Sequence, residues 1–235
     1  MTVTNQNSRD DKRTLWYLRK IPLLKAIRER LDELVPSVEI REIKRRQVVY
    51  LPGDPGESVF FLVGGRVKCS KVSRDGKELT LSYRGAGNMF GELGALDSSP
   101  REEMVEAMKN AIMLEVPAEL FRKLLQENAA LCFAFATVVG QRRRDMEKKL
   151  EHLAFGDVHA KLASLLLDLD RDYGLDTDIG REIDLKITHQ EMANLIGSTR
   201  ETISTTLAQF KKKGLLHLSG RTVTLLDKKG LQALT

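Results

Sequence analysis

The chain has 235 residues, of which 42% are hydrophobic and 30% are charged, and its formal net charge is +5. This length and apolar content suffice for one large hydrophobic core or two modest ones. No segment approaches the roughly 18 apolar residues of a membrane span, and the first residues lack a secretory apolar run. We therefore expect a cytoplasmic protein that does not engage a membrane. Two cysteines, Cys69 and Cys132, are too few for a disulfide framework or a four-cysteine metal site, and each is expected to be a small buried hydrophobe.

The N-terminal half contains three segments with different residue patterns. Residues 1–14 are mostly polar, which predicts a mobile tail, and residues 15–34 carry apolar residues at helical spacing with a break at Pro22. Short β-type runs then alternate with glycine, proline and aspartate turns, which indicates an all-β sandwich or barrel, with Asp75-Gly76 as a hairpin turn. The expected strands are 38–43, 48–51, 59–63, 67–72, 79–83 and 112–116.

Helical periodicity resumes at Ala118 and continues to about Phe155, with a break expected near Glu127 and Asn128. In the second part the spacing alternates between four and three residues, which is the a/d pattern of a coiled coil. This pattern predicts a long helix through which two chains form a homodimer; the alternative is a helix buried against its own domain. The seam consists of Cys132, Ala136, Val139, Arg143, Met146, Leu150 and Leu153.

The C-terminal part reads as a winged helix-turn-helix. Asp157 caps a helix expected over 158–173, and the acidic stretch 168–184 is expected to be a loop that leads into a strand at 183–187. Two short amphipathic helices follow within 187–210 and meet at Gly197, where a left-handed backbone is needed. Thr188 and Glu191 form a capping box for the first helix, and Ser198 or Thr199 caps the second. Residues 215–218 and 222–226 flank a turn at 219–221 and form a wing.

Charge is distributed unevenly over this C-terminal part. Residues 157–185 contain three basic and eight acidic residues, whereas residues 186–235 contain eight basic and three acidic ones. A basic surplus on a helix-turn-helix is the footprint expected for contact with a phosphate backbone. The alternative is a solvated lysine face on a small domain.

In this order, the elements resemble the CRP/FNR family of bacterial transcription regulators. The motifs that carry the resemblance are GDPGESVFFLVGGRVK, FGELGALDSSPR, HLAFGDVHAKLASLLL and ITHQEMANLIGSTRETIS. The resemblance implies an α+β chain with a double-stranded β-roll (jelly roll) as sensor domain, a long dimerisation helix and a winged helix-turn-helix. We place these parts at 15–127, 128–156 and 157–235, with a hinge at 155–157.

The resemblance also implies a ligand pocket. Gly91, Glu92 and Leu93 would approach a cyclic nucleotide, and Arg101 would pair with its phosphate; alternatively, Glu92 and Arg101 form an ion pair within the domain. Where cyclic-AMP binders carry hydroxyl and small residues, this chain has Glu102 and Glu103, and Met146 and Glu147 stand where two adenine-contacting hydroxyls would lie. Cyclic AMP in the usual mode is therefore not expected. The remaining inputs are another cyclic nucleotide or phosphorylated effector, a gas or redox signal, or none; no metal site is expected.

For the DNA-binding domain, the resemblance implies that Arg200, Glu201, Ser204 and Thr205 face the major groove. Arginine and glutamate favour a G·C pair, whereas Thr205 replaces a second arginine and predicts looser specificity or a thymine methyl contact. Phosphate contacts are expected from polar residues around the two helices and from basic residues nearby. These residues are Thr188, His189, Gln190, Ser198, Thr199, Thr202, Lys211, Lys212, Lys213 and Arg221.

Together these features predict a homodimeric, sequence-specific regulator of transcription that binds a palindromic operator and is controlled by an effector. The resemblance also implies that it contacts RNA polymerase and activates transcription. The alternatives are a ligand-binding module of a signalling complex and a DNA-binding regulator with no effector. No Ser/His/Asp set, nucleotide P-loop or metal-ligand spacing is present in the sequence, so no enzyme is expected.

Overall fold

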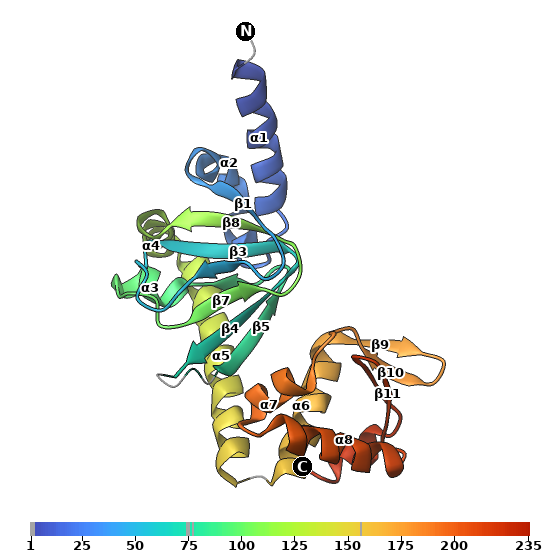
Figure 1. Ribbon diagram of the computed structural model, residues 1–235. Coiled ribbons are helices and arrows are strands. Elements are labelled where there is room, and N and C mark those ends of the chain that lie inside the picture. The colour runs from blue at the N-terminus through green and yellow to red at the C-terminus, as the bar shows by residue number, and fades with distance from the viewer. Residues whose placement is uncertain (1–2, 74–75, 77, 156) are drawn as a thin grey trace. The chain divides into compact units, whose positions relative to one another are not determined.

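The computed structural model describes residues 3–73, 76, 78–155 and 157–235, with side chains described from residue 10 onward except at 74, 75, 77, 148, 149 and 152–156. The chain divides into two compact units, Met1–Gln141 and Arg142–Thr235. The boundary between them lies within helix α5 (Ala129–Phe155). Each unit has its own elements and its own β-structure (Figure 1).

The first unit begins with helices. These are α1 (Val3–Leu18), η1 (Leu23–Arg30), α2 (Leu31–Leu34) and η2 (Val35–Ser37). The break expected at Pro22 is confirmed, since Pro22 is the N-cap of η1. The expected tail boundary at residue 14 is wrong, because α1 runs through it from Val3. Tyr17 and Leu18 are buried and anchor the last turn of α1, and a helix already started adds further turns at little cost.

Two four-stranded sheets form the β-roll, in the orders β1-β8-β3-β6 and β2-β7-β4-β5 (Figure 1). All six expected strands are present, and β4 pairs with β5 in the expected antiparallel hairpin, although Asp75 lies outside the described residues. The short strands β6 and β7 were not expected. The strands are β1 (Glu39–Ile43), β2 (Val48–Tyr50), β3 (Ser58–Gly64), β4 (Arg66–Val72), β5 (Glu78–Gly85), β6 (Met89–Phe90), β7 (Met104–Ala107) and β8 (Ala111–Pro117).

Strand β3 shows why the roll needs an uninterrupted apolar run. Its alternate residues Phe60 and Leu62 pack between the two sheets. Val59 and Phe61 point the other way and pack against the helices. Because side chains alternate along a strand, a strand covered on both faces must be apolar at every position. The run at 59–63 therefore encodes a layer of helices as well as a sheet.

The helices of the first unit cover this outer face. In chain order, these helices include α3 (Glu92–Asp97), α4 (Ala118–Glu127) and the first part of α5. Phe121 of α4 packs edge to face with Phe61 of β3 and with Phe135 of α5. The break expected near Asn128 is confirmed. Asn128 has an extended backbone, and its side chain accepts a hydrogen bond from Leu131 N at 2.9 Å.

The second unit contains a four-stranded sheet in the order β11-β12-β10-β9 and four helices after α5. Asp157 caps α6 as expected, accepting from Ala160 N at 2.8 Å. The wing is confirmed as β11 and β12. The elements are α6 (Val158–Tyr173), β9 (Gly174–Thr177), β10 (Gly180–Ile183), α7 (His189–Ile196), α8 (Arg200–Lys212), β11 (Leu216–Ser219), β12 (Thr222–Leu225) and α9 (Lys228–Gln232).

The acidic segment 168–184 corrects two expectations. Its first part belongs to α6, and its second part forms the β9–β10 hairpin instead of a loop. The strand expected at 183–187 is wrong, because β10 ends at Ile183. The physical reason is that β10 pairs with β12, some 40 positions later in the chain. Local patterns carry no information about such a distant partner.

One buried carboxylate joins three elements of this unit. Asp170 in α6 is fully buried, accepts a hydrogen bond from Arg181 Nε of β10 at 2.9 Å and forms an ion pair with Lys228 Nζ of α9 at 2.6 Å. Burial by itself would raise the pKa of Asp170, but the hydrogen bonds from Lys228 and Arg181 outweigh it and lower that pKa. The acidic segment and the basic C-terminus therefore neutralise each other here.

Asp170→Asn is expected to lower the free energy of unfolding by about 1–3 kcal/mol at pH 7, since the charge-assisted hydrogen bond from Arg181 is weakened and the ion pair with Lys228 is lost. A lowered folded pKa stabilises the fold above the unfolded value of about 3.9 and loses this effect as the pH falls through the folded pKa. The difference between variant and parent in urea unfolding should therefore shrink below about pH 4. Asp168→Asn, at an exposed ion pair with Arg171, is the control and should change little. A difference independent of pH would contradict this account.

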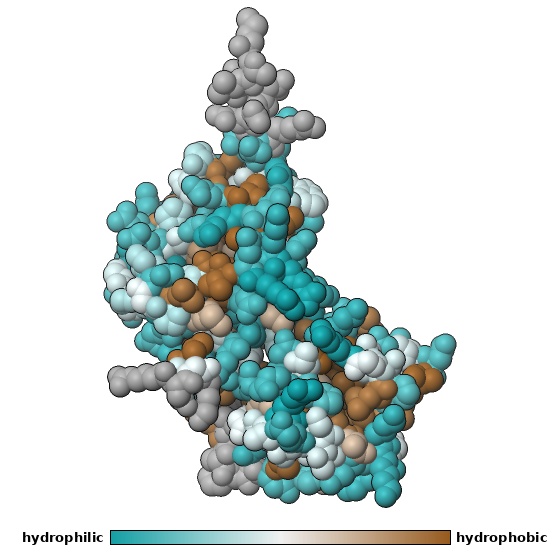
Figure 2. All heavy atoms as spheres, viewed as in Figure 1, coloured by the Kyte–Doolittle hydropathy of each residue, from teal (hydrophilic) through white to brown (hydrophobic). Residues whose placement is uncertain are grey.

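Most of the face visible in Figure 2 is hydrophilic, with hydrophobic residues in scattered patches. Among the described helices none is both long enough and apolar enough to cross a membrane.

Candidate DNA-binding interface and sensor pocket

The first helix of the helix-turn-helix is held by the expected capping box. Thr188 Oγ1 accepts from Glu191 N at 3.1 Å, and Glu191 Oε2 accepts from Thr188 N at 2.6 Å. The same carboxylate accepts the Thr188 hydroxyl proton at 2.7 Å. The hydroxyl and the backbone N–H of Thr188 are therefore both bonded to Glu191, and Thr188 is the N-cap of α7.

The turn between α7 and α8 is also as expected. Gly197 has φ +63°, the left-handed conformation that glycine adopts without strain. Of the two candidate caps for α8, Thr199 is the one used, since its side chain accepts from Thr202 N at 3.2 Å. The turn thus fixes where α8 begins and which residues face outward.

Helix α8 has one buried and one exposed face. Ile203, Leu207 and Phe210 are fully buried. On the opposite side, Arg200, Glu201 and Thr205 are exposed, as predicted for residues that contact bases. A shallow groove of about 470 Å³ follows this side and is lined by Ser204, Thr205, Ala208, Gln209 and Lys212. Ala208 was not among the predicted residues.

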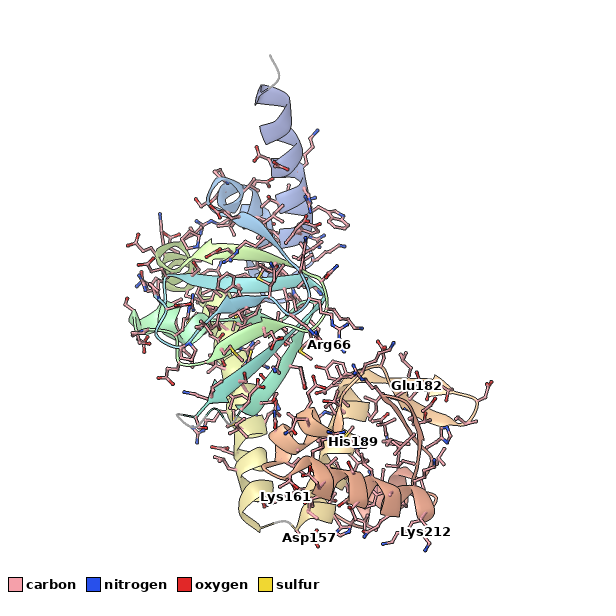
Figure 3. The ribbon with its side chains drawn as sticks, in the orientation of Figure 1. Arg66, Asp157, Lys161, Glu182, His189 and Lys212 are labelled. Atoms are coloured by element: carbon pink, nitrogen blue, oxygen red, sulfur yellow. The ribbon has the colours of Figure 1, made fainter. Side chains whose placement is uncertain are left out.

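Two residues that the sequence assigned to separate contacts are joined in the structure. His189 Nδ1 lies 2.7 Å from Ser204 Oγ, and Ser204 Oγ donates to Arg200 O at 2.9 Å. Since the hydroxyl has a single proton, His189 Nδ1 is the donor in the first of these bonds. Figure 3 shows His189 at the start of α7. The pair ties α7 to α8, so Ser204 is a positioning residue as well as a candidate base contact.

The remaining polar candidates lie around the same two helices. Gln190 is exposed and donates to Asn194 Oδ1 at 2.9 Å, Thr202 is half-buried beside Thr199, and Ser198 is half-buried in the turn. The basic residues Lys211, Lys212, Lys213 and Arg221 are exposed, at the end of α8 (Lys212 in Figure 3) and in the wing turn. The second unit therefore brings polar and basic side chains together around an exposed helix.

In the β-roll, the segment 91–93 starts the short helix α3. Gly91 has φ +75°, and a β-carbon there would lie 2.7 Å from Arg101 Nη1. Glu92 is buried, whereas Leu93 is 61% exposed. Glycine at 91 is therefore required by the arginine packed against it.

Arg101 is buried and bound within the protein. Nη2 donates to Ser58 O at 2.6 Å, Nη1 donates to Gly91 O at 2.5 Å, and the guanidinium lies 4.6 Å from the centre of the Tyr50 ring. A guanidinium that stacks on an aromatic ring and bonds two carbonyls is held firmly in place. Tyr50 was not predicted as a site residue, because no local pattern links it to residue 101.

The two glutamates that follow Arg101 point to opposite sides. Glu102 is exposed and pairs with Lys71 Nζ at 2.9 Å. Glu103 is half-buried and accepts from Tyr50 Oη at 3.0 Å. The expected repulsion of a phosphate therefore comes from Glu103 alone. Burial, followed by the charge of Glu103, raises the pKa of the Tyr50 hydroxyl.

The cysteines differ in their surroundings. Burial, with Glu103 nearby, raises the pKa of Cys69 to about 12, so its thiol is protonated and unreactive at neutral pH. Cys69 is thus the small buried hydrophobe that was expected. For Cys132 the expectation of burial is wrong, since its side chain is exposed on α5 in the single chain. Cys132 belongs to the predicted seam, whereas its neighbour Leu131 is buried in the core of the first unit.

Helix α5 presents two faces. Leu131 and Phe135 are buried in the core of the first unit. On the seam, Ala136, Met146 and Leu150 are exposed, Arg143 donates to Glu147 Oε1 at 2.8 Å, and Val139 is half-buried against that core. The side chain of Leu153 lies outside the described residues. Most of the described seam side chains are therefore exposed in the single chain.

A cyclic nucleotide fits these residues only in part. Among the described residues, Arg101 Nε has no hydrogen-bond partner, so one buried donor remains for an anionic group. Glu103, which is hydrogen-bonded to Tyr50, the residue on whose ring Arg101 stacks, would repel such a group. The described residues contain no group of three or more His, Cys, Asp or Glu side chains that could hold a metal ion.

The fold and these sites define a DNA-binding regulator with a β-roll sensor domain. Residues 40–128 match the family model of the cyclic nucleotide-binding domain, and residues 160–234 match that of the Crp-like helix-turn-helix domain. The global nitrogen regulator of Synechococcus elongatus is 32% identical over 192 residues, which cover 81% of this chain and 86% of the relative. The chain belongs to the CRP/FNR family of transcription regulators, and it is a DNA-binding regulator.

Other relatives differ in the effectors that their names give. A CRP-like cAMP-activated global transcriptional regulator of Mycobacterium tuberculosis is 27% identical and covers 84% of this chain and 88% of its own. Among solved structures, the c-di-GMP responsive global regulator CLP of Xanthomonas campestris has a TM-score of 0.72 at 28% identity and covers 81% and 94% of the two chains. The α+β fold inferred from the sequence is thus confirmed, whereas the relatives do not share one effector.

Proposed function

We propose that the protein acts in the cytoplasm as a homodimer that binds a palindromic operator with two copies of α8 and contacts RNA polymerase, as an activator of transcription. The observation that carries the proposal is the exposed polar face of α8, with Arg200 and Glu201 at its start. Two such helices related by a dimer axis suit half-sites about one helical turn apart. The exposed seam positions Met146 and Leu150 support dimerisation through α5.

The direct test is binding at physiological salt. Purified protein should bind a palindrome selected from random duplexes far more tightly than unselected duplex of the same length. Equal affinity for both would remove the proposal. Turnover assays with common phosphoesters should remain negative, since we assign no catalytic role to any residue.

Arg200→Ala is expected to weaken operator binding and to relax the preference at one base pair by about 1–3 kcal/mol, because arginine bridges two acceptors of guanine. Fluorescence anisotropy with operators substituted at each position measures this loss. Lys211→Ala is the matched control: a phosphate contact should weaken all sequences alike and lower the salt dependence by about one charge. If Arg200→Ala kept full discrimination, Arg200 would not be the base-reading residue.

For the effector, we infer that cyclic AMP is not recognised in the usual mode. Arg101 already donates to two carbonyls, and Glu103 accepts from Tyr50, the residue on whose ring Arg101 stacks. Isothermal titration with cyclic AMP, cyclic GMP and cyclic di-GMP, with and without operator DNA, tests this inference. Tight binding of cyclic AMP alone would contradict it, whereas binding of another nucleotide would identify a phosphorylated effector.

A second candidate is a regulator that binds DNA without any effector. It is favoured by the two hydrogen bonds that Arg101 already donates to carbonyls within the protein, although its Nε–H has no partner among the described residues. An effector can act only if it binds one arrangement of the two units more tightly than another. The expected hinge between these arrangements is 155–157, of which Gly156 lies outside the described residues. Equal operator affinity in the presence and absence of all three nucleotides would support this candidate.

A further inference from the structure

Three consecutive hydroxyl side chains on α8 are bonded in the same way. Ser204, Thr205 and Thr206 donate to the backbone carbonyls of Arg200, Glu201 and Thr202, at 2.9, 3.0 and 2.9 Å. A hydroxyl has one proton, so a side chain bonded in this way cannot donate to a base at the same time. None of these three hydroxyls therefore has a free proton to donate to DNA.

Thr205 is the exposed member of this set. Thr206 is buried, and Ser204 is half-buried and accepts from His189. Because the Thr205 hydroxyl donates its proton back to the helix, its γ-methyl group and the two acceptor lone pairs of its oxygen are what remain for a partner. A guanine, whose major-groove edge carries only acceptors, cannot be bonded by this side chain without breaking the bond to Glu201.

The neighbouring residue reinforces the apolar character of this position. Ala208 lies three residues further along α8, is exposed, and lines the same shallow groove as Thr205. Residues three apart are neighbours on a helix surface. Two methyl groups therefore lie close together on a face that is otherwise polar or charged, with Glu201 and Lys212 at either end.

In the major groove, thymine is the base that presents a methyl group. We propose that Thr205 recognises thymine through its C5-methyl group, with Ala208 extending the contact, so that each half-site contains a thymine at this position. The inference rests on the proposed function, in which α8 enters the major groove. It names a specificity-determining residue where the sequence left looser specificity as an alternative.

The test replaces thymine by deoxyuridine, one position at a time, in one half-site of a selected palindrome. This change removes the methyl group and leaves the hydrogen-bonding edge of the base unchanged. We expect one position at which the dissociation constant rises about three- to fivefold, which is the factor supplied by burial of one methyl group. Other thymines should respond by less than about twofold.

Two variants assign the effect to Thr205. Thr205→Val keeps a methyl group at this place and lacks the hydroxyl, so the deoxyuridine penalty should persist. Thr205→Ser keeps the hydroxyl and lacks the methyl group, so the penalty should fall below about twofold. Lys212→Ala should weaken binding to every operator and leave the penalty unchanged.

The outcomes separate this inference from the function on which it rests. If the palindrome is bound no better than random duplex, the proposed function fails and the inference with it. If the palindrome is bound more tightly than random duplex, any of three results overturns the inference. These are the absence of a thymine whose replacement by deoxyuridine weakens binding, a deoxyuridine penalty that persists in Thr205→Ser, and a deoxyuridine penalty that is lost in Thr205→Val. Binding of each variant to the unmodified operator shows that it is folded.

Discussion

Replacing Leu150 by aspartate is expected to convert the dimer into monomers and to reduce operator affinity by at least about 100-fold. Leu150 is 59% exposed in the single chain, so the change costs little there. In the proposed dimer the two residues would meet at the α5 seam, and burying like charges costs several kcal/mol, with each 1.4 kcal/mol worth a factor of ten. Sedimentation velocity measures the assembly, and anisotropy on whole and half operators measures binding.

Leu175→Asp is the matched control for this experiment. Leu175 lies on β9, is 56% exposed, and is not part of the seam. The control should remain dimeric and bind as the parent does. If Leu150→Asp also remained dimeric, α5 would not be the interface, and the alternative of a helix that serves only its own chain would be favoured.

Arg101→Gln is expected to destabilise the first unit by about 2–4 kcal/mol even without any ligand. The change removes two charge-assisted hydrogen bonds and the stacking on Tyr50, and it leaves the carbonyls of Ser58 and Gly91 without this donor. The only tryptophan, Trp16, lies in α1 of the same unit. Its fluorescence during urea unfolding therefore reports on the unit in question.

The control is Arg41→Gln, which removes an arginine from a half-exposed ion pair with Glu115 at 3.1 Å in the same unit. It should cost at most about 1 kcal/mol. If Arg101→Gln were equally mild, Arg101 would be held only loosely by the protein and would be free to bind a phosphate. A large loss of stability would show that Arg101 has a structural role in the first unit, and the nucleotide titrations test its role in ligand binding separately.

The local features of the helix-turn-helix could be predicted because their causes are local. The cap at Thr188, the left-handed Gly197 and the apolar repeat of α8 depend on residues three or four positions apart. The same holds for the break at Asn128 and the start of α6 at Asp157. Each is confirmed to within a residue or two.

Contacts between distant segments could not be predicted. The β9–β10 hairpin was missed because β12 stabilises it, and the three-way ion cluster at Asp170 requires residues 11 and 58 positions away. In the β-roll, Tyr50 meets Arg101 and Glu103 only after the sheets close. Hydrogen bonding and burial depend on such partners, and a linear pattern does not contain them.

The amino-acid sequence by itself determined the family, the order of the β-roll, the long helix and the winged helix-turn-helix, and the exposure of Arg200, Glu201 and Thr205 on α8, since periodicity and capping are encoded within a few turns of chain. The tertiary structure decided what these residues can still do. It directed Glu102 outward and Glu103 inward, bound Arg101 to two carbonyls, and turned the hydroxyl of Thr205 back to Glu201. A donor already bonded within the protein is unavailable to a ligand, and only the folded chain shows which donors are bonded.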